Sequence, residues 1–331
     1  MSMKITRYEF IARAVDPIAH HEENLGNMSV FMRKRMMLPN GTVQRVPYVT
    51  GDSIRHKARE AAVYATLDAA GLLSDPQLTE GALRLLFAGG MVTGKGDASV
   101  INLDSFRELI NLFPPLALFG GCVDNRPLPG QLIVDEGNLV CEETIHTAPS
   151  WVSEWLTANG VQLQTHRRLL EEVTRVRMDP TLSPEKVKLL SGDQQISVNR
   201  RLSASGKAHD DGDAKDAERE KSSMMPRSFE RIIQGSLFWC GIEARTYSPL
   251  EADAFDYTVG CLLNNFTVGG KCATGHGKLR FVAGNRIHFA PSSGTLEGMG
   301  TDLAGNTGTT FRAHVKEHAE QLRSWLGRVV A

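Results

Sequence analysis

Two segments far apart in the sequence carry residue types suited to binding phosphate. Residues 45–59 read Arg-Val-Pro-Tyr-Val-Thr-Gly-Asp-Ser-Ile-Arg-His-Lys-Ala-Arg, and residues 268–280 read Val-Gly-Gly-Lys-Cys-Ala-Thr-Gly-His-Gly-Lys-Leu-Arg. Each joins an extended apolar stretch to a turn of small residues and then to cations. Small residues let a backbone approach a phosphate closely, and the cations neutralise its charge. Two such segments in one chain predict a nucleic-acid binding surface.

The first segment follows the order proline, apolar residue, small residues with Gly and Ser, apolar residue and Arg-x-x-x-Arg. The matching residues are Pro47, Gly51, Ser53, Arg55 and Arg59. The second is a glycine-rich loop, and a third piece is Ala117-Leu-Phe-Gly followed by residues 129–135. These residues span most of the chain. On them, the chain resembles the RAMP superfamily of CRISPR-associated proteins. Within that superfamily it is most similar to the Cas-seven-type backbone subunit, in the version of the type IV effector complex.

The resemblance implies an α+β fold: a modified RRM-like (ferredoxin-like) antiparallel sheet, called the palm, with a helical insertion and a β-hairpin thumb. It implies that identical subunits line up along a guide (CRISPR) RNA and hold its backbone, while the guide bases pair with a target and carry the specificity. The expected partners are the guide RNA, further copies of the chain, other CRISPR effector subunits, and target DNA or RNA reached through the guide.

The candidate RNA-binding residues are Arg33, Arg35, Arg45, Ser53, Arg55, His56, Lys57, Arg59, Lys95, Gly269, Gly270, Lys271, Gly275, His276, Gly277 and Lys278. Met224 and Met225 stand at the edge of the expected thumb. A flexible apolar side chain can wedge between bases, so we expect either this role or packing in the base of the hairpin. No catalytic residue, metal or cofactor is predicted.

The composition is that of an ordinary soluble globular protein. The chain has 331 residues, of which 41% are hydrophobic and 23% charged, with a formal net charge of -1. This length permits one elaborate domain or two ordinary ones. A near-neutral chain does not coat nucleic acid through bulk charge, so local clusters must supply phosphate contacts. Such clusters are Arg33 to Arg35, Arg55 to Arg59, Arg167-Arg168 with Arg175 and Arg177, Arg200-Arg201, and Lys278 with Arg280.

The five cysteines are widely scattered, and their spacing offers no Cys-x-x-Cys zinc ligands. We expect buried free thiols in a reducing cytoplasm. No apolar run approaches the roughly 20 residues that span a bilayer, so no membrane association is expected.

The local patterns place the candidate residues on definite elements. Residues 4–15 alternate as a strand, and residues 28–49 predict a hairpin with a type I′ turn at Asn40-Gly41. Residues 54–70 predict a helix capped by Asp52 or Ser53, with Arg55 and Arg59 on one face near its start. Residues 311–330 have the spacing of a closing amphipathic helix.

The polar stretch 203–223 has almost no large apolar residue and cannot bury a core, so a mobile hairpin tip is expected there. The predicted division is the first part of the palm with the basic hairpin (1–51), a mostly helical insertion (52–112), the middle of the palm (113–190), the thumb with its mobile tip (191–235), and the last part of the palm with the glycine-rich loop and C-terminal helix (236–331).

Several other patterns have partial likeness to enzyme motifs. Residues 89–95 begin like a P-loop, but Gly96 replaces the Ser or Thr that holds magnesium and the preceding residues look helical. A glycine-rich connector is favoured there. Residues 269–277 lack the Gly-x-Gly-x-x-Gly order, which leaves a structural turn or an RNA-backbone loop. Neither a Ser-His-Asp order nor an activated cysteine is evident.

Residues 20–23, His-His-Glu-Glu, have the residue types of a metal site, although a solvated loop is the simpler interpretation. The main alternative function is a metal-dependent, RNA-cleaving backbone subunit like that of type III complexes. That role would need an acidic residue between Asp16 and Glu23. The other alternative is an assembly protein that forms oligomers without RNA.

Overall fold

The computed structural model describes residues 3–25, 27–74, 78–90, 103–123, 126–177, 188, 192, 194–196, 225–290, 293–298 and 307–328. The chain divides into two compact units. The first comprises Met1–Glu22, Phe31–Glu171 and Arg231–Ala331, and the second comprises Glu23–Val30 and Glu172–Glu230. This division differs from the five segments predicted above. Most of the expected thumb lies outside the described residues.

The fold is α+β, as predicted, and an eight-stranded sheet forms the centre of the first unit. Its strand order is β14-β13-β1-β12-β9-β5-β4, and β8 also pairs with β12. The strands are β1 (Lys4–Ala14), β4 (Arg33–Met37), β5 (Val43–Val49), β8 (Leu132–Val134), β9 (Gly137–Leu139), β12 (Leu237–Thr246), β13 (Leu279–Ala290) and β14 (Ser293–Gly298). The neighbouring pairs are antiparallel.

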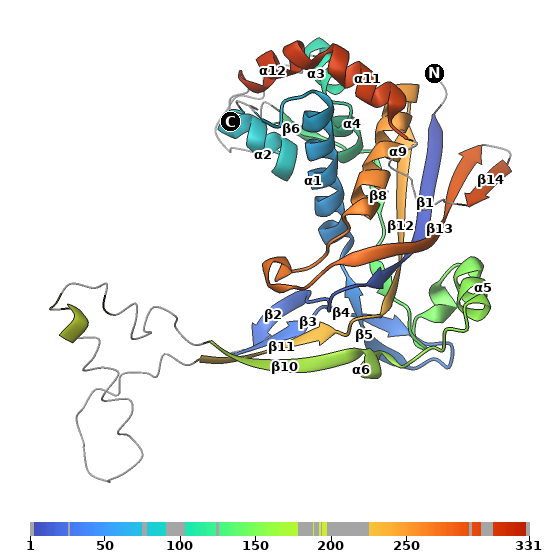
Figure 1. Ribbon diagram of the computed structural model, residues 1–331. Helices are drawn as coiled ribbons and strands as arrows, with labels where there is room; N and C mark the ends of the chain where they lie inside the picture. Colours follow the sequence, from blue (N-terminus) through green and yellow to red (C-terminus); the bar gives the residue numbers. More distant parts are fainter. Residues whose placement is uncertain are drawn as a thin grey trace, which may run out of the picture. The chain divides into compact units, whose positions relative to one another are not determined.

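Strand β1 is buried on both faces of this sheet. Tyr8, Phe10, Ala12 and Ala14 point toward helices α1 (Gly51–Ala69) and α9 (Pro249–Asn264), which lie against each other over one face (Figure 1). Ile11 points the opposite way and packs with α5 (Ser150–Ala158). Because successive side chains of a strand alternate between faces, one apolar strand joins both hydrophobic layers.

Helix α1 begins earlier than predicted. Its N-cap is Thr50, whose side chain accepts a hydrogen bond from the backbone N–H of Ser53, so the expected cap at Asp52 or Ser53 is wrong. Gly51 then forms the first turn where an added Cβ would lie 2.7 Å from the carbonyl oxygen of Val134. Gly71, at φ +66°, follows the end of the helix as predicted.

The basic hairpin pairs β4 with β5, but its turn is not type I′. Gly41 has φ +80°, whereas Asn40 does not have positive φ. The N–H of Gly41 donates to the carbonyl of Leu38 at 2.9 Å, and the N–H of Leu38 donates to Thr42. This is a type I turn followed by a left-handed glycine. Pro39 favours it because its fixed φ suits the second position of a type I turn.

A second cluster of helices surrounds the C-terminal half of α1. It contains α2 (Glu80–Ala88), α3 (Leu103–Leu112), α4 (Pro115–Phe119), α11 (Thr309–Glu317) and α12 (Ala319–Leu326), which gather at one end of Figure 1. The sequence of residues 116–140 is typical of short strands and turns, but its first residues belong to α4. The expected closing helix is two helices, separated at His318. Strands β6 (Gly121–Val123) and β7 (Arg126–Leu128) form a small separate pair.

Four strands form another sheet, in the order β10-β11-β3-β2: β10 (Leu170–Arg177), β11 (Met225–Ile232), β3 (Met28–Phe31) and β2 (His21–Leu25). Within the second unit, β11 and β3 pair in parallel, with Phe229 opposite Ser29. The guanidinium of Arg175 lies 5.6 Å from the ring centre of Phe229. Met224 lies outside the described residues, as does the side chain of Met225, so their role as a wedge stays a prediction.

Candidate nucleic-acid interface

The glycine-rich loop folds back on the segment that follows β1. The N–H of Gly270 donates to the carbonyl of Ala19 at 2.7 Å, and the N–H of Gly277 donates to Pro17 at 2.9 Å. The loop closes on itself where Val268 donates to the carbonyl of Gly277. We call residues 15–20, 50–53 and 266–278 together the loop junction.

The two predicted phosphate-binding segments meet at this junction. The backbone N–H of Gly269 donates to the hydroxyl oxygen of Ser53 at 3.4 Å, across 216 positions of sequence. A Cβ on Gly269 would lie 2.3 Å from the carbonyl oxygen of Ala19, and one on Gly277 would lie 2.3 Å from that of Val268. Both glycines have positive φ, so only glycine permits this packing without strain.

At the tip of the loop, Lys271 has φ +63° and is the only non-glycine residue with positive φ among those that the structure describes. Such a conformation costs free energy in an L-residue. Lys271, Lys278 and Gly275 are exposed. The loop therefore carries two exposed cations beside a tightly packed backbone.

His20 joins the loop after β1 to the start of α1. Its Nε2 accepts a hydrogen bond from the backbone N–H of Thr50 at 3.2 Å and lies equally close to the Thr50 hydroxyl. The ring also packs edge-on against Phe31. Burial, together with the charge of His21, lowers the pKa of His20. A neutral imidazole is needed at this position because a protonated Nε2 cannot accept from Thr50.

His276, a predicted RNA contact, is buried, with 3% of its surface exposed. Its Nδ1 lies 3.0 Å from the carbonyl oxygen of Thr274, which can only accept, so Nδ1 is the donor. Its Nε2 lies 3.4 Å from a guanidinium nitrogen of Arg231. These contacts give His276 a role in fixing the loop.

Arg55 and Arg59 share a helix face as predicted, and both donate to protein carbonyls. Arg55 donates to Leu132 at 2.6 Å and to Phe119 at 2.8 Å. Arg59 donates to Phe119 at 2.9 Å and to Gly120 at 3.1 Å. Each guanidinium also lies against the Phe119 ring, at 5.8 and 5.2 Å from its centre.

Two of these carbonyls belong to the end of α4 and would lack intrahelical partners. Burial, and secondarily the charge of Arg55, lowers the pKa of Arg59 to about 10. Arg55 and Arg59 therefore cap α4 in this structure. Of the residues between them, His56 is exposed and Lys57 pairs with Glu60 at 2.8 Å.

Exposed arginines face each other on antiparallel strands at two places. Arg35 is directly opposite Arg45 in the basic hairpin, and Arg33 shares their face by alternation. The Arg45 side chain is 64% exposed, and its guanidinium lies 3.8 Å from the carboxylate of Glu22. Arg13 is directly opposite Arg280, beside the loop junction.

Arg13, Arg35 and Arg280 are exposed and make no ion pair within the described part of the chain. Like charges directly opposite each other destabilise a sheet. Sequence analysis missed Arg13 because only strand register reveals the pairing.

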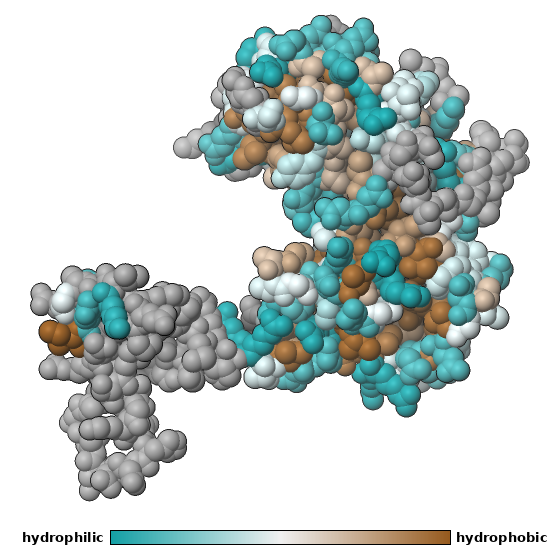
Figure 2. Space-filling view, in the orientation of Figure 1, coloured by the Kyte–Doolittle hydropathy of each residue, from teal (hydrophilic) through white to brown (hydrophobic). Residues whose placement is uncertain are grey.

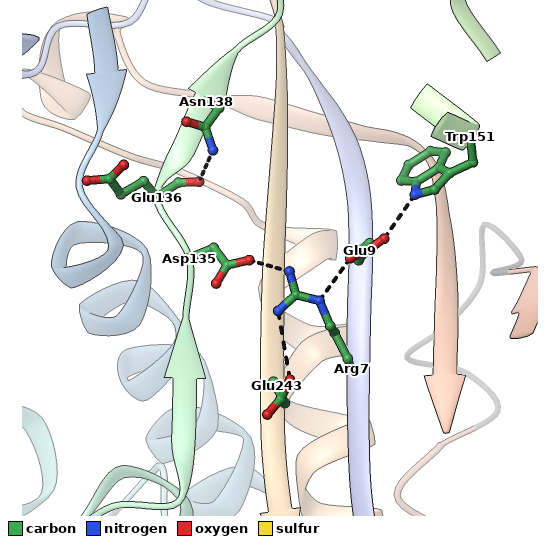
Figure 3. A network of polar contacts seen from close by, with 7 residues as sticks. All are labelled: Arg7, Glu9, Asp135, Glu136, Asn138, Trp151 and Glu243. Carbon is green, nitrogen blue, oxygen red and sulfur yellow. Dashed lines mark hydrogen bonds and ion pairs between the residues drawn. The ribbon is translucent and has the colours of Figure 1, made fainter. Parts of the chain in front are cut away.

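The opposite sheet face, toward α5, carries a separate polar cluster around Arg7 (Figure 3). Its Nε donates to Glu9 at 2.9 Å, its Nη2 donates to Asp135, and Glu243 lies 3.9 Å away. Trp151 of α5 donates to the other oxygen of Glu9 at 3.0 Å. Burial alone would lower the pKa of Arg7, but the bonds to Asp135 and Glu9 raise it.

The contacts of this polar cluster indicate that it stabilises the fold. A Cβ at position 241 would lie 2.3 Å from the Asp135 carboxylate, so Gly241 makes room for the ion pair. The guanidinium occupies the space among the three carboxylates. Across the described residues, no group of three His, Cys, Asp or Glu side chains is arranged to hold a metal ion. The expected solvated loop at residues 20–23 is wrong, because His21–Leu25 form β2, and the carboxylate of Glu22 lies near Arg45.

Three further expectations can be compared with the described residues. Residues before the P-loop-like segment are helical, as expected from the sequence, but Lys95 lies outside the described residues. All five cysteines are free, but only Cys141 and Cys240 are buried as expected; Cys122 and Cys261 are half-buried and Cys272 is exposed. No helix in the described part of the chain combines the length and apolarity needed to cross a membrane.

The comparisons with known proteins found similarity among solved structures. No family model matches the chain, and no curated protein matches it. Among solved structures, it is similar to a chain of one described as "Type IV-B CRISPR Complex", with 16% sequence identity and a TM-score of 0.49. The alignment covers 89% of this chain and 96% of that chain.

The buried and exposed arginines should respond differently to substitution. We expect Arg59→Met to lower the free energy of unfolding by about 1–3 kcal/mol, because it leaves the carbonyl of Gly120 without its arginine donor and that of Phe119 with Arg55 alone. Arg45→Met, at a mostly exposed side chain, should change it by less than about 0.5 kcal/mol. Urea unfolding followed by circular dichroism measures both. Equal losses would contradict the capping role of Arg59.

The stability of the loop junction should depend on pH through His20. The pKa of His20 is lower in the folded state than its unfolded value of about 6.5. Its contribution to the free energy of unfolding is therefore fully present above about pH 6.5 and is lost as the pH falls toward the pKa of the folded state. We expect His20→Gln, which keeps an acceptor for Thr50 but does not titrate, to lose less stability than the native chain between about pH 7.5 and about pH 5.5. Urea midpoints at both values measure the difference. Identical losses would show that His20 is not the titrating group.

Proposed function

We propose that this chain is a non-catalytic RNA-binding subunit of a type IV-like CRISPR ribonucleoprotein. In this proposal several copies line up along a guide RNA, hold its backbone without reading its sequence, and leave its bases free to pair with a target nucleic acid. Other effector subunits would bind the ends of the assembly.

The observation that carries the proposal is the placement of the opposed arginines. Like charges directly opposite each other destabilise a sheet, so neither the Arg35–Arg45 nor the Arg13–Arg280 pairing helps the chain fold, although Glu22 partly offsets the charge of Arg45. A polyanion relieves this repulsion and releases its own counterions on binding. The arginines are exposed on strands, where the sheet fixes their spacing. A repeating phosphate backbone is the ligand that suits such a fixed row of cations.

The loop junction supports the same proposal. The contact between Ser53 and Gly269 brings together the two segments on which the resemblance to the backbone subunits rests. Its glycines make a compact backbone surface, and Lys271 and Lys278 add exposed charge. Contacts of this kind are made with phosphates and sugars, which are the same in every sequence.

Strand order supports the proposed palm. Along the chain the elements follow the order β1, α1, β8 and β9, β12, α9, β13. In the sheet the strands lie in the order β13-β1-β12-β9. Together these two orders match a split βαβ or ferredoxin-like sheet. In this proposal α1 belongs to the palm itself, since it contributes Ile54, Ala58 and Ala62 to the sheet core. The thumb between β10 and β11, and its wedge at Met224 and Met225, remain part of the proposal.

Charge reversal on the hairpin tests RNA binding. We expect Arg35→Glu/Arg45→Glu to weaken binding of a guide-length RNA by at least about tenfold and to lower the slope of log affinity against log salt by about one to two. Fluorescence anisotropy at several salt concentrations measures both.

The control is Lys316→Glu, an exposed cation on α11 in the helical cluster, which should bind RNA like the native chain. Light scattering of the same samples, with and without RNA, tests assembly along the guide. Native affinity in the hairpin variant would overturn the assignment of the interface. Equal oligomers without RNA would favour a pure assembly protein.

A further inference from the structure

A pocket of about 470 Å³ lies where the basic hairpin meets the short helix α6 (His166–Leu169) and the start of β10. Its walls include Arg33 and Arg45 from the hairpin, and His166 and Arg167 from α6. All of these residues belong to the first unit. Hydrophilic residues and hydrophobic patches are interspersed over the end of this unit that carries β4, β5 and α6 (Figure 2). No local pattern indicated that residues 166–167 face the hairpin.

The described residues that line this pocket include three arginines and no acidic residue. Arg45 and Arg167 are both exposed, so their guanidinium groups can turn toward a ligand. Arginine presents its donors in a planar fork that matches phosphate oxygens in two-point contact. The pocket therefore has the charge and donor geometry of an anion site.

His166 is held in place from behind by a buried carboxylate. The Glu143 oxygens lie 2.9 Å from its backbone nitrogen and 2.9 Å from its Nδ1, the latter off the line of a good hydrogen bond. Burial would raise the pKa of Glu143, but bonds to its charged form, chiefly from the His166 backbone, lower it. With Nδ1 directed at Glu143, Nε2 is the ring nitrogen left for a ligand. The bond to the backbone nitrogen fixes the start of α6, and Nδ1 lies beside Glu143 without a hydrogen bond to it.

The remaining walls are partly apolar. Val43, 48% exposed, and Leu170 line the pocket beside the cations. The volume lies within the range of pockets that take small organic ligands, and exceeds what a bare phosphate ion needs. An anion with an attached group that can pack on apolar side chains, such as a nucleotide with the C–H edge of its sugar, suits this combination.

We propose that this pocket binds one nucleotide of the RNA held by the hairpin, with its phosphate between Arg45 and Arg167 and its sugar against Val43 and Leu170. The inference rests on the proposed function and adds α6 to the RNA interface. His166 then contributes a donor or acceptor at the pocket floor, positioned by Glu143.

Adjacent arginines on α6 offer a matched test. Arg167 lines the pocket, whereas the neighbouring Arg168 does not and instead donates to Gln164. We expect Arg167→Glu to weaken binding of a fluorescein-labelled oligouridine by about tenfold and to lower the salt slope by about one, and Arg168→Glu to change affinity by less than about threefold. Arg167→Lys, which keeps the charge but loses the planar fork, should restore only part of the affinity. Urea unfolding checks that all variants fold.

The outcomes separate the two proposals. If the native chain fails to bind oligouridine, the proposed function itself is wrong. If it binds, but Arg167→Glu and Arg168→Glu weaken binding equally, the pocket assignment is overturned while RNA binding stands. Poly-glutamate of matched charge serves as a competitor. Displacement of RNA by poly-glutamate at equal charge concentration would show a site for acidic chains in general and would overturn the nucleotide assignment.

Discussion

The close approach of the glycine-rich loop to residues 17–19 is the constraint on which the rest of the interface depends. Its backbone hydrogen bonds hold the beginning of β13 against the end of β1, and Ser53 joins the start of α1 to the same point. Because Gly269 and Gly277 leave no room for side chains, the loop has one way to pack. The cations on the neighbouring strands consequently stand at fixed positions relative to one another.

Arginines in this chain divide into two groups by what their guanidinium groups contact. Arg55 and Arg59 donate to carbonyls at the end of α4, and Arg7 lies among three carboxylates on the opposite sheet face. The folded chain accounts for these side chains completely. Arg13, Arg35 and Arg280 sit opposite like charges instead, an arrangement that the proposed RNA ligand would explain. Opposition of like charges therefore marks the arginines proposed to bind RNA, whereas clustering in sequence does not separate them from the structural ones.

Much of the local structure could be predicted from the sequence, because its signals are local. Alternation predicted β1, and Gly71 marked the end of α1. Two local details depended on neighbouring residues that suit the same role. Thr50 caps α1 in place of Asp52 or Ser53, and Pro39 favours a type I turn. These are small differences of position that leave the fold class unchanged.

The roles of individual site residues could not be predicted, because their partners are distant in sequence. From local sequence, Arg59 is a cation near the start of a helix. Its partners, the carbonyls of Phe119 and Gly120, lie some 60 positions later in the sequence. The opposition of Arg13 to Arg280 depends on strand register, and the approach of Arg167 to the hairpin depends on packing. Local patterns contain none of this information.

Photo-crosslinking tests the central claim most directly. The protein would be bound to an RNA containing 4-thiouridine, irradiated, digested and examined by mass spectrometry for peptides that carry nucleotide. The account predicts crosslinks in residues 31–49 and 266–280, at the hairpin and the loop junction. Crosslinks concentrated on α2, α11 and α12 would contradict it.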